Sequence, residues 1–304
     1  MSEKLTVLIP CKNERKNIRP CIESLRNVAD EILVADSGST DGTQDIVRSI
    51  GGCRLIEREF LNYASFKNWA IPQAAHRWVL VVDADERVTE QLTAEIKNVL
   101  TDPPDHLDGY WISFLAYFMG HPLRHAGWNT AALRLIRRDR CRYKPRRVHE
   151  EIQVDPNRAG RLRSKLLHFS FWTYDEYFAK YVRYTRWGAE EMRDRGKRAG
   201  TYSLLVRPFA RFLQLYVLRR GFLDGLPGLQ ICILMAFFNT FVKQARLWEM
   251  EHALPQPDPV AESLQENRDT AVRVRCEDPT EPQHPTSERS ELRAQQRLPE
   301  SANV

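Results

Sequence analysis

Short apolar runs and longer stretches with helical spacing alternate along the first hundred residues of the chain. The apolar runs are rich in β-branched residues and are typical of buried parallel strands. The strands are expected at 5–9, 31–35, 53–57 and 77–82, and the helices at 17–27, 39–51, 64–75 and 89–100. Repeated alternation of strand and helix predicts an α/β fold, with an open, mainly parallel sheet covered by helices on both faces.

Residues with strong preferences for helix ends set the limits of three of these helices. Ser39 or Thr40 is available as the N-cap of the second helix, and Gly51 is expected to stop it. Pro72 must distort or end the third helix, because proline lacks the backbone N–H that would continue it. Thr89 is the expected N-cap of the fourth helix.

The pattern changes after the first hundred residues. Residues 107–170 mix short strands with turns, and the chain becomes helical from about residue 171. The apolar face expected on that first helix consists of Phe178, Tyr181, Val182 and Thr185. A second apolar region covers 204–248. From 253 to 304 the composition shifts to Pro, Gln, Glu, Arg and Ser, which predicts a disordered tail.

The composition is that of a soluble globular protein, with 42% hydrophobic and 28% charged residues among 304. A formal charge of +5 is too small to indicate a nucleic-acid binder by itself. Six scattered cysteines without a CxxC pair or zinc-like spacing favour free thiols in a reducing compartment. The N-terminus enters a strand at once, without the basic-then-apolar order of a signal peptide, so we expect a cytoplasmic protein.

Three polar segments follow the expected strands, at 10–14, 36–42 and 83–86. In an open parallel sheet, ligands bind in the crevice outside the carboxyl ends of the strands. These three segments are therefore expected to meet there and to form the binding site.

Asp83 and Asp85 end the strongest strand of the sequence and form a D-x-D pair. Two such carboxylates facing one pocket would repel each other, and a hard cation such as Mg²⁺ or Mn²⁺ removes the conflict. The same tripeptide also occurs in simple turns, but its position opposite two other polar loops favours a metal site. Glu86 has a structural alternative, as a residue preceding the helix that starts near Thr89.

The segments VLIPCKNERKNI, EILVADSGSTDGT and WVLVVDADERV closely resemble the family 2 inverting glycosyltransferases of GT-A fold. The later segments GHPLRHAGW, RLIRR, VHEEI, LLHFSF and GFLDGLPGLQ look like the branch of lipopolysaccharide-core β-1,4-glucosyltransferases that act on heptose. The resemblance covers roughly residues 5–248. It implies a nucleotide-sugar half at 1–105 and an acceptor half at 106–170 of one catalytic domain. We interpret the helical pattern at 171–252 as a separate, membrane-associating region.

The resemblance also assigns roles to individual positions. The residues implied to bind the nucleotide sugar are Pro10, Asn13, Glu14, Asp36, Ser37, Lys67, Asp83 and Ala84. Asp85 is implied to be the direct metal ligand, and His168 is the candidate that completes the metal shell. Many members carry a second acid where this chain has Ser37, so the identity of the nucleotide base stays open.

An inverting transfer needs one carboxylate that deprotonates the acceptor hydroxyl as it attacks the anomeric carbon. The resemblance and the polar turn before it favour Glu150 as this base, with Glu151 as the alternative. On a strand the two side chains point to opposite faces, so only one can serve. His149 is expected to orient Glu150 or the diphosphate.

A strongly basic run from Arg134 to Arg147 is either a solvated strand face or a grip on phosphate, from the donor or from a phosphorylated glycolipid. A single aromatic residue, Tyr143, lies among these arginines, and so few stacking rings argue against nucleic acid. Trp128, with His121 and His125, is expected to line the acceptor pocket.

The uncharged segment 226–242 is at the lower length limit for crossing a bilayer. Arginines at 207, 211, 219 and 220 suit a helix in an anionic headgroup layer, although packing onto the catalytic domain or in a dimer is the alternative. We favour a peripheral location on the inner face of the plasma membrane.

These features predict a metal-dependent inverting glycosyltransferase. It would move a hexose, with glucose favoured, from a nucleotide-diphosphate sugar to a lipid-linked saccharide acceptor. Two alternatives remain: transfer directly to a polyprenyl phosphate, and a non-catalytic module that binds nucleotide sugars or a lipid surface.

Overall fold

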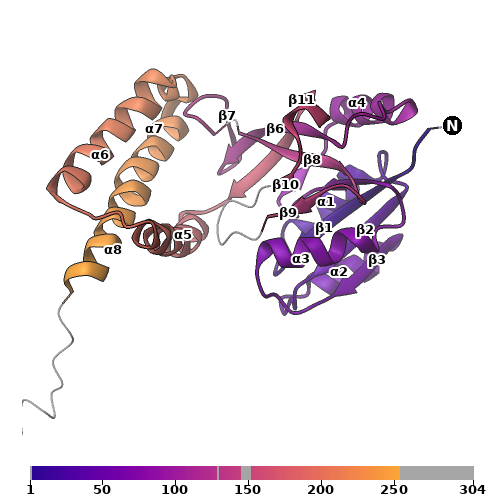
Figure 1. The fold of residues 1–304 in the computed structure, drawn as a ribbon, viewed down its shortest axis with the longest axis horizontal. Helices are drawn as coiled ribbons and strands as arrows, with labels where there is room; N and C mark the ends of the chain where they lie inside the picture. The colour runs from indigo at the N-terminus through magenta and orange to yellow at the C-terminus, as the bar shows by residue number, and fades with distance from the viewer. Residues whose placement is uncertain (1, 129, 145–151, 254–304) are drawn as a thin grey trace, which may run out of the picture. The chain divides into compact units, whose positions relative to one another are not determined.

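The computed structural model of the protein describes residues 2–128, 130–144 and 152–253 (Figure 1). Within these residues, nine strands form one sheet, ordered β3-β2-β1-β4-β8-β6-β11-β5, with β7 paired to β6. The strands are β1 Leu5–Cys11, β2 Glu31–Asp36, β3 Cys53–Glu57, β4 Trp78–Val81, β5 Glu86–Arg87, β6 Gly109–Phe118, β7 His121–Leu123, β8 Ala131–Arg137 and β11 Ala159–Phe171. Strands β9 (Arg142–Tyr143) and β10 (Ile152–Gln153) form a separate antiparallel pair.

The two halves of the sheet differ in strand direction. Strands β3, β2, β1 and β4 are parallel throughout, as the alternation of strands and helices predicts. In the other half, β8 runs antiparallel to both β4 and β6, while β6 and β11 are parallel. The predicted parallel half is therefore confirmed, and a mixed half extends it.

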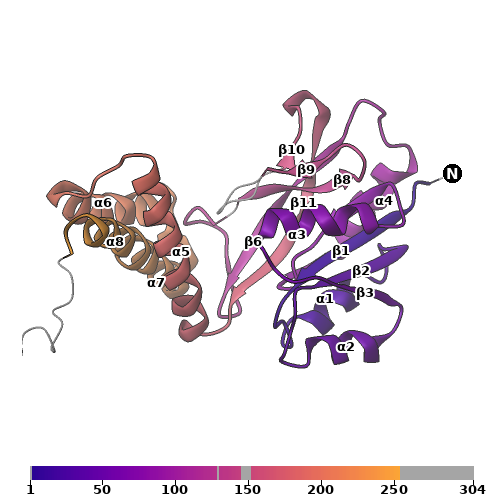
Figure 2. The same cartoon turned by 60° about the horizontal axis from the view of Figure 1, so that its bottom comes forward.

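Helices cover both faces of the parallel half (Figure 2). The helices of this half are α1 Ile18–Leu25, α2 Thr43–Ile50, α3 Tyr63–Ala70 and α4 Glu90–Thr101. Helices α1, α2 and α4 share a core with Leu5, Val7 and Ile9, whose side chains point to one face of β1. Helix α3 packs on the other face, against Leu8 of β1 and Val79 and Val81 of β4. Short 3₁₀ turns follow at η1 (Ile71–Gln73) and η2 (Pro156–Arg158).

The predicted helix ends are correct except for one. Thr89 caps α4, since its hydroxyl accepts the Leu92 N–H at 3.1 Å, and Gly51 ends α2 with a φ of 68°. Helix α2 begins at Thr43, however, so neither Ser39 nor Thr40 is its cap. The Ser39 hydroxyl is instead bonded to the Asp36 carboxylate.

The C-terminal part of the described chain is helical and continuous with the end of the sheet. Its elements are α5 Tyr174–Asp194, α6 Thr201–Leu213, η3 Gln214–Leu218, η4 Gly221–Asp224, α7 Gly225–Ile233, η5 Leu234–Thr240 and α8 Phe241–His252. They pack on Phe118, Leu123 and Phe171, at the ends of β6, β7 and β11.

The expected apolar face of α5 is partly wrong. Tyr177, Thr185 and Ala189 form its buried face, whereas Phe178 and Val182 are 38% and 44% exposed. The sequence pattern could not separate these two faces, because apolar residues occur on both sides of the helix. The expected tail at 253–304 lies outside the described residues apart from Ala253.

Candidate active site

The three polar segments predicted to meet do leave the same edge of the sheet. Cys11, the last residue of β1, is paired with Asp36, the last residue of β2. On the other side of β1, Leu8 is paired with Val81, and the backbone N–H of Val82 bonds to the Leu8 carbonyl at 3.0 Å. Adjacent strands are about 4.8 Å apart. The loops after β1, β2 and β4 are therefore neighbours.

The loop after β2 is organised around the buried carboxylate of Asp36. It accepts hydrogen bonds from the backbone N–H groups of Gly38 and Ser39, at 3.0 and 2.8 Å, and from the Gln44 amide at 2.7 Å. Burial raises the pKa of Asp36, but these hydrogen bonds outweigh it and hold the pKa below its ordinary value. Asp36 therefore shapes this loop, and it would have to exchange a hydrogen bond to contact a nucleotide directly.

Hydrogen bonds also join the loop after β1 to the loop after β2, which contains Ser37. The Ser37 hydroxyl donates to the Cys11 carbonyl at 3.2 Å. Asn13 has a φ of 56°, a left-handed conformation that asparagine tolerates, and its side-chain oxygen accepts the Thr40 N–H at 2.9 Å. The Glu14 N–H donates to the Thr43 hydroxyl at 2.9 Å. The first two loops thus form one hydrogen-bonded unit beside half-buried Pro10.

Asp83 is held between two cations. Its carboxylate oxygens lie 3.5 Å from Nζ of Lys67 on α3 and 2.7 Å from a guanidinium nitrogen of Arg134 on β8. Although burial raises the pKa of Asp83, Arg134 and Lys67 together hold it well below its usual range. Asp83 is thus a fixed anion at physiological pH.

Glu86 is the fully buried partner of the same Arg134, so its suggested role before helix α4 is wrong. One of its carboxylate oxygens accepts from Arg134 at 2.6 Å, and the other accepts the backbone N–H of Asp83 at 2.8 Å. Burial raises the pKa of Glu86, and Arg134 opposes this shift. Glu86 therefore fixes the turn that carries Asp83 and Asp85.

Asp85 faces a different partner. Its Oδ2 atom lies 3.3 Å from Nε2 of His168, and its backbone carbonyl accepts the N–H of Phe169 at 2.8 Å. Burial alone would raise the pKa of Asp85, but His168 and Lys180 outweigh it and lower the pKa. The predicted pair of metal ligands is therefore brought together, although 83 residues separate the two in the sequence.

Two further ionisable residues belong to this site. Burial, with the nearby Asp85 and Asp83, raises the pKa of Glu14 to about 7. Lys180 on α5 has its Nζ over the Phe171 ring at 5.1 Å, and the charges of Asp85 and Asp83 raise its pKa although burial opposes this. Sequence reasoning missed Lys180. Its signal was a lysine at helical spacing among Tyr177, Tyr181 and Tyr184.

Several predicted residues take other positions or cannot be placed. Ala84 is buried, and its carbonyl accepts from Arg87 at 2.8 Å. Trp128 packs edge-on against Phe171, with ring centroids 6.3 Å apart. The His125 ring bonds to Asp224 at 2.9 Å. Arg147, His149, Glu150 and Glu151 lie outside the described residues, so their roles stay predictions.

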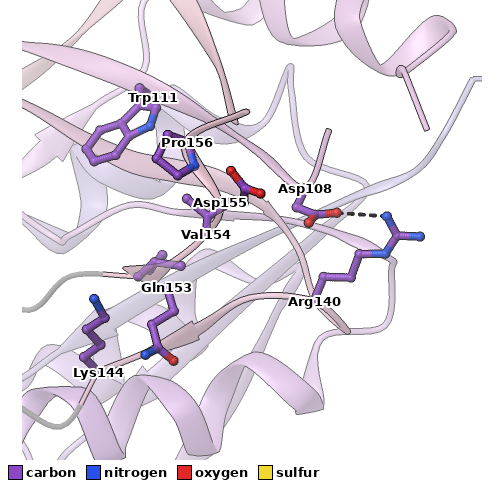
Figure 3. Close-up of a pocket in the computed structure, with 9 residues that line it drawn as sticks. Asp108, Trp111, Arg140, Lys144, Gln153, Val154, Asp155 and Pro156 are labelled. Atoms are coloured by element: carbon purple, nitrogen blue, oxygen red, sulfur yellow. Dashed lines mark hydrogen bonds and ion pairs between the residues drawn. The ribbon is translucent and has the colours of Figure 1, made fainter. Parts of the chain in front are cut away.

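Much of the predicted basic run has structural partners. The fully buried Arg137 donates to the carbonyls of Leu107 and Pro104 and lies over the Trp78 ring at 5.1 Å. Arg140 bonds to the Asp108 carboxylate at 2.9 Å, and Figure 3 marks this interaction with a dashed line. Arg134 itself is committed to Asp83 and Glu86. These three arginines therefore do not form a free cationic surface.

A hollow of about 560 Å³ lies beside Asp108, and Figure 3 shows residues that line it. It is lined by Asp108, Trp111, Arg140, Lys144, Ile152, Gln153, Val154, Asp155 and Pro156. The Asp108 carbonyl accepts the N–H of Arg137, which is paired with Trp78, the first residue of β4. The hollow therefore lies near the opposite end of β4 from Asp83.

The Asp85 and His168 side chains fit a divalent cation. Ligand bonds of about 2.1 Å, at right angles or slightly wider, place two donor atoms about 3.0–3.4 Å apart. Across the described ranges, no group of three or more His, Cys, Asp or Glu side chains is placed to hold a metal ion. A two-residue donor set suits Mg²⁺ or Mn²⁺, which complete their shells with water and substrate phosphates.

Comparisons with known proteins agree with the resemblance seen in the sequence. The model of glycosyl transferase family 2 matches residues 6–161. The lipopolysaccharide core biosynthesis glycosyltransferase LpsC of Rhizobium meliloti is 32% identical over 266 residues, covering 86% of this chain and 97% of LpsC. A glycosyltransferase of Rickettsia prowazekii described as uncharacterized is 27% identical over 259 residues, covering 82% of this chain and 88% of that protein.

Among solved structures, glucosyl-3-phosphoglycerate synthase from Mycobacterium tuberculosis, in complex with Mn²⁺, UDP and glucosyl-3-phosphoglycerate, is similar to this chain at 21% identity and a TM-score of 0.32. The match covers 38% of this chain and 44% of that one, so the chain spans less than half of that enzyme. The family match, together with the sheet described above, confirms the predicted GT-A fold.

Proposed function

Because the chain belongs to glycosyl transferase family 2, we propose that it transfers a hexose, with glucose favoured, from a nucleotide-diphosphate sugar to a saccharide carried on a lipid. The similarity to LpsC over most of both chains supports an acceptor in the lipopolysaccharide core, because that relative's name states this role. The later sequence motifs resemble the same branch.

One observation carries the proposal: Asp85 and His168 lie 3.3 Å apart, next to Asp83 between Lys67 and Arg134. The first pair would hold Mg²⁺ or Mn²⁺, which would neutralise charge on the leaving diphosphate. Lys67 and Arg134 keep Asp83 ionised and hold its carboxylate in place, where it would face the sugar or ribose. Lys180 adds a cation from α5 on the side of Asp85.

The transfer would proceed with inversion, with Glu150 as the general base. The acceptor hydroxyl loses its proton to this carboxylate as it attacks the anomeric carbon, and the nucleoside diphosphate leaves from the opposite side. The similarity of VHEEI to the family supports this role, and the neighbouring Glu151 offers a matched control.

The enzyme would work at the cytoplasmic face of the inner membrane, attached peripherally, since a lipid-linked acceptor is presented there. This location agrees with the free state of the five cysteines in the described part of the chain.

Paired variants test the base directly. Glu150→Gln should keep its affinity for the nucleotide sugar and lose transfer by at least roughly a hundredfold, while Glu151→Gln keeps most of the activity. Radiolabelled sugar transfer and donor binding by calorimetry would be measured on both. Full activity of Glu150→Gln would eliminate this residue as the base.

The acceptor class is tested in the same assay. Core-type lipid-linked saccharides and polyprenyl phosphate would be offered separately, and transfer is expected only to the saccharide. Transfer only to polyprenyl phosphate would replace the proposed acceptor. Nucleotide binding without transfer or donor hydrolysis in the presence of Mn²⁺ would identify a binding module instead.

A further inference from the structure

The C-terminal helices carry large apolar side chains on their solvent side. Of the 19 large hydrophobic residues that are exposed in the described chain, 17 lie after residue 171. The most exposed in this region are Leu218 at 77%, Leu226 at 72% and Tyr202 at 67%. A soluble protein does not normally gather so much exposed apolar area on one region.

Six of these side chains form a stripe on a helical hairpin. The first arm of the hairpin is α6–η3, which carries the stripe, and the second arm is α7–η5–α8. The stripe consists of Tyr202, Leu205, Val206, Phe209, Leu213 and Val217. Their spacing of three, four, seven, eleven and fifteen residues places them on one face of a helix. Ser203, Pro208 and Leu215 lie on the other, buried side. The stripe is therefore an apolar helix face exposed to solvent.

The turn of the hairpin extends the same surface. Leu218, Phe222, Leu223 and Leu226 surround the turn and are all exposed. The two arms contact each other through Phe212 and Phe237, whose ring centroids are 6.1 Å apart. The exposed residues are therefore those left over after the arms have packed together.

The charge of this region is strongly positive. Residues 195–248 contain nine basic side chains and a single acidic one, Asp224. The Asp224 carboxylate is occupied, because it accepts the backbone N–H groups of Arg124 and His125 at 3.0 and 2.9 Å and also bonds to the His125 ring. An apolar face among arginines fits an anionic lipid surface.

The hairpin is suited to lie on the bilayer and not to cross it. Gly221–His252 is a helical run of 32 residues, long and apolar enough to span, and only 22% of its most apolar part is buried. Its first turn is tied to the β7 loop through Asp224, and Leu247 near its other end is packed against Ala189 of α5. Both ends of the run are therefore held by contacts with other elements of the protein, which favours a helix that lies on the bilayer.

We propose that the apolar stripe of α6 and the turn 217–226 insert into the headgroup layer of an anionic bilayer and hold the protein on it. The inference deepens the proposed function and rests on it, because the surface would bring the site to a lipid-linked acceptor. The hairpin packs on Phe171, three residues beyond His168, so the attached surface and the candidate active site belong to one folded unit.

Vesicle flotation of the full chain tests the proposal without donor or acceptor. The protein should float with phosphatidylcholine vesicles containing phosphatidylglycerol, should bind pure phosphatidylcholine less, and should be partly released by high salt. The double variant Leu218→Glu/Leu226→Glu should bind the anionic vesicles at least roughly tenfold more weakly, since two leucines lose their lipid contact. The single variant Leu226→Glu should give a smaller loss of the same kind.

Leu61→Glu is the matched control, because Leu61 is 67% exposed but precedes α3, far along the chain from the hairpin. It should bind vesicles like the unaltered protein. Both charged variants alter exposed side chains, and their thermal unfolding would be recorded alongside. Equal binding by the double variant, or no binding by the unaltered protein, would overturn the proposal.

Sedimentation equilibrium identifies the main rival occupant, a second copy of the chain. A dimer that fails to bind vesicles and dissociates in the double variant would overturn membrane docking and make the stripe a subunit interface. Neither result depends on sugar transfer, so the proposed function stands or falls separately in its own assay.

Discussion

The two ends of strand β4 carry charged clusters that look alike in sequence and differ in what they leave open. Near the start of β4, the Asp108 carboxylate is bonded to Arg158 at 2.6 and 2.9 Å and to Arg140 at 2.9 Å. The hydrogen bonds from these arginines lower the pKa of Asp108 to about 2. Both oxygens of this carboxylate are taken by guanidinium groups, and no ligand is needed to balance its charge.

After the end of β4, the acidic side chains are not all paired with cations in this way. Asp83 and Glu86 share Arg134, while Asp85 has only His168 at 3.3 Å as a hydrogen-bonding side chain in the described residues. The pKa of the half-buried Glu14 nearby is raised, chiefly by burial and in addition by Asp85 and Asp83. A cluster of acidic and basic side chains therefore marks a ligand site only where its charges do not already pair with one another.

The largest difference is expected in sugar transfer, between two variants that each lose one carboxylate, at opposite ends of β4. Asp85→Asn should lower sugar transfer by roughly a thousandfold, because the proposed metal, which would neutralise the leaving diphosphate, would lose a ligand. Asp108→Asn should leave turnover near that of the unaltered protein and lower only its thermal stability. Steady-state transfer rates on folded variants check this, and equal losses in the two would remove the distinction between the ends.

The second largest difference is expected between Arg134 and Arg140, in what each contributes to the free energy of unfolding. Arg134→Met should destabilise the protein by about 3–5 kcal/mol, because Glu86 becomes a buried carboxylate without its cation. Arg140→Met, which removes a partner 36% exposed, should cost less than about 1 kcal/mol. Urea unfolding of both variants measures the difference.

A double variant sharpens this second test. Adding Glu86→Gln to Arg134→Met should recover part of the lost stability, since the buried charge is then removed as well. If Arg134→Met alone is as stable as Arg140→Met, the buried cluster does not hold the turn that carries Asp83 and Asp85.

The smallest expected effect is a pH dependence arising from Glu14. Its pKa rises from 4.5 to about 7 on folding, so the folded state binds the extra proton between these values. The stabilisation from this proton is complete below the unfolded pKa and is lost as pH rises through the folded one. Glu14→Gln, which stays neutral, should therefore gain stability relative to the unaltered protein between about pH 5 and pH 8.

Thermal unfolding in the presence of a chelator, across this pH range, measures the Glu14 effect. A stability difference that does not change with pH would show that Glu14 is not held protonated by its buried acidic surroundings.

The sequence predicted the parallel half of the sheet because its signals are local. The apolar runs around Leu5, Glu31 and Trp78 become strands, Thr89 caps its helix, and the polar segments after them meet at one edge. Pairing of Asp85 with His168 was also foreseen, but only through the resemblance to a family, since no local pattern links residues so far apart.

The features that sequence reasoning missed depend on contacts between distant segments. Glu86 is a buried partner of Arg134 because β8 lies beside β4, and Lys180 reaches the acids because α5 follows β11. The exposed apolar stripe of α6 could not be separated from a buried one, because helical spacing alone does not say which face is covered. These contacts, and the face of a helix that is covered, are set by how distant segments pack together.

Binding of nucleoside diphosphates to the unaltered protein tests the central claim, that the loops after β1, β2 and β4 form one metal-dependent site. A calorimetric panel of nucleoside diphosphates would be recorded with Mn²⁺ and then with a chelator. We expect saturable binding of one of them with Mn²⁺, and binding at least roughly tenfold weaker after chelation. No binding of any of them, or the same affinity without metal, would contradict it.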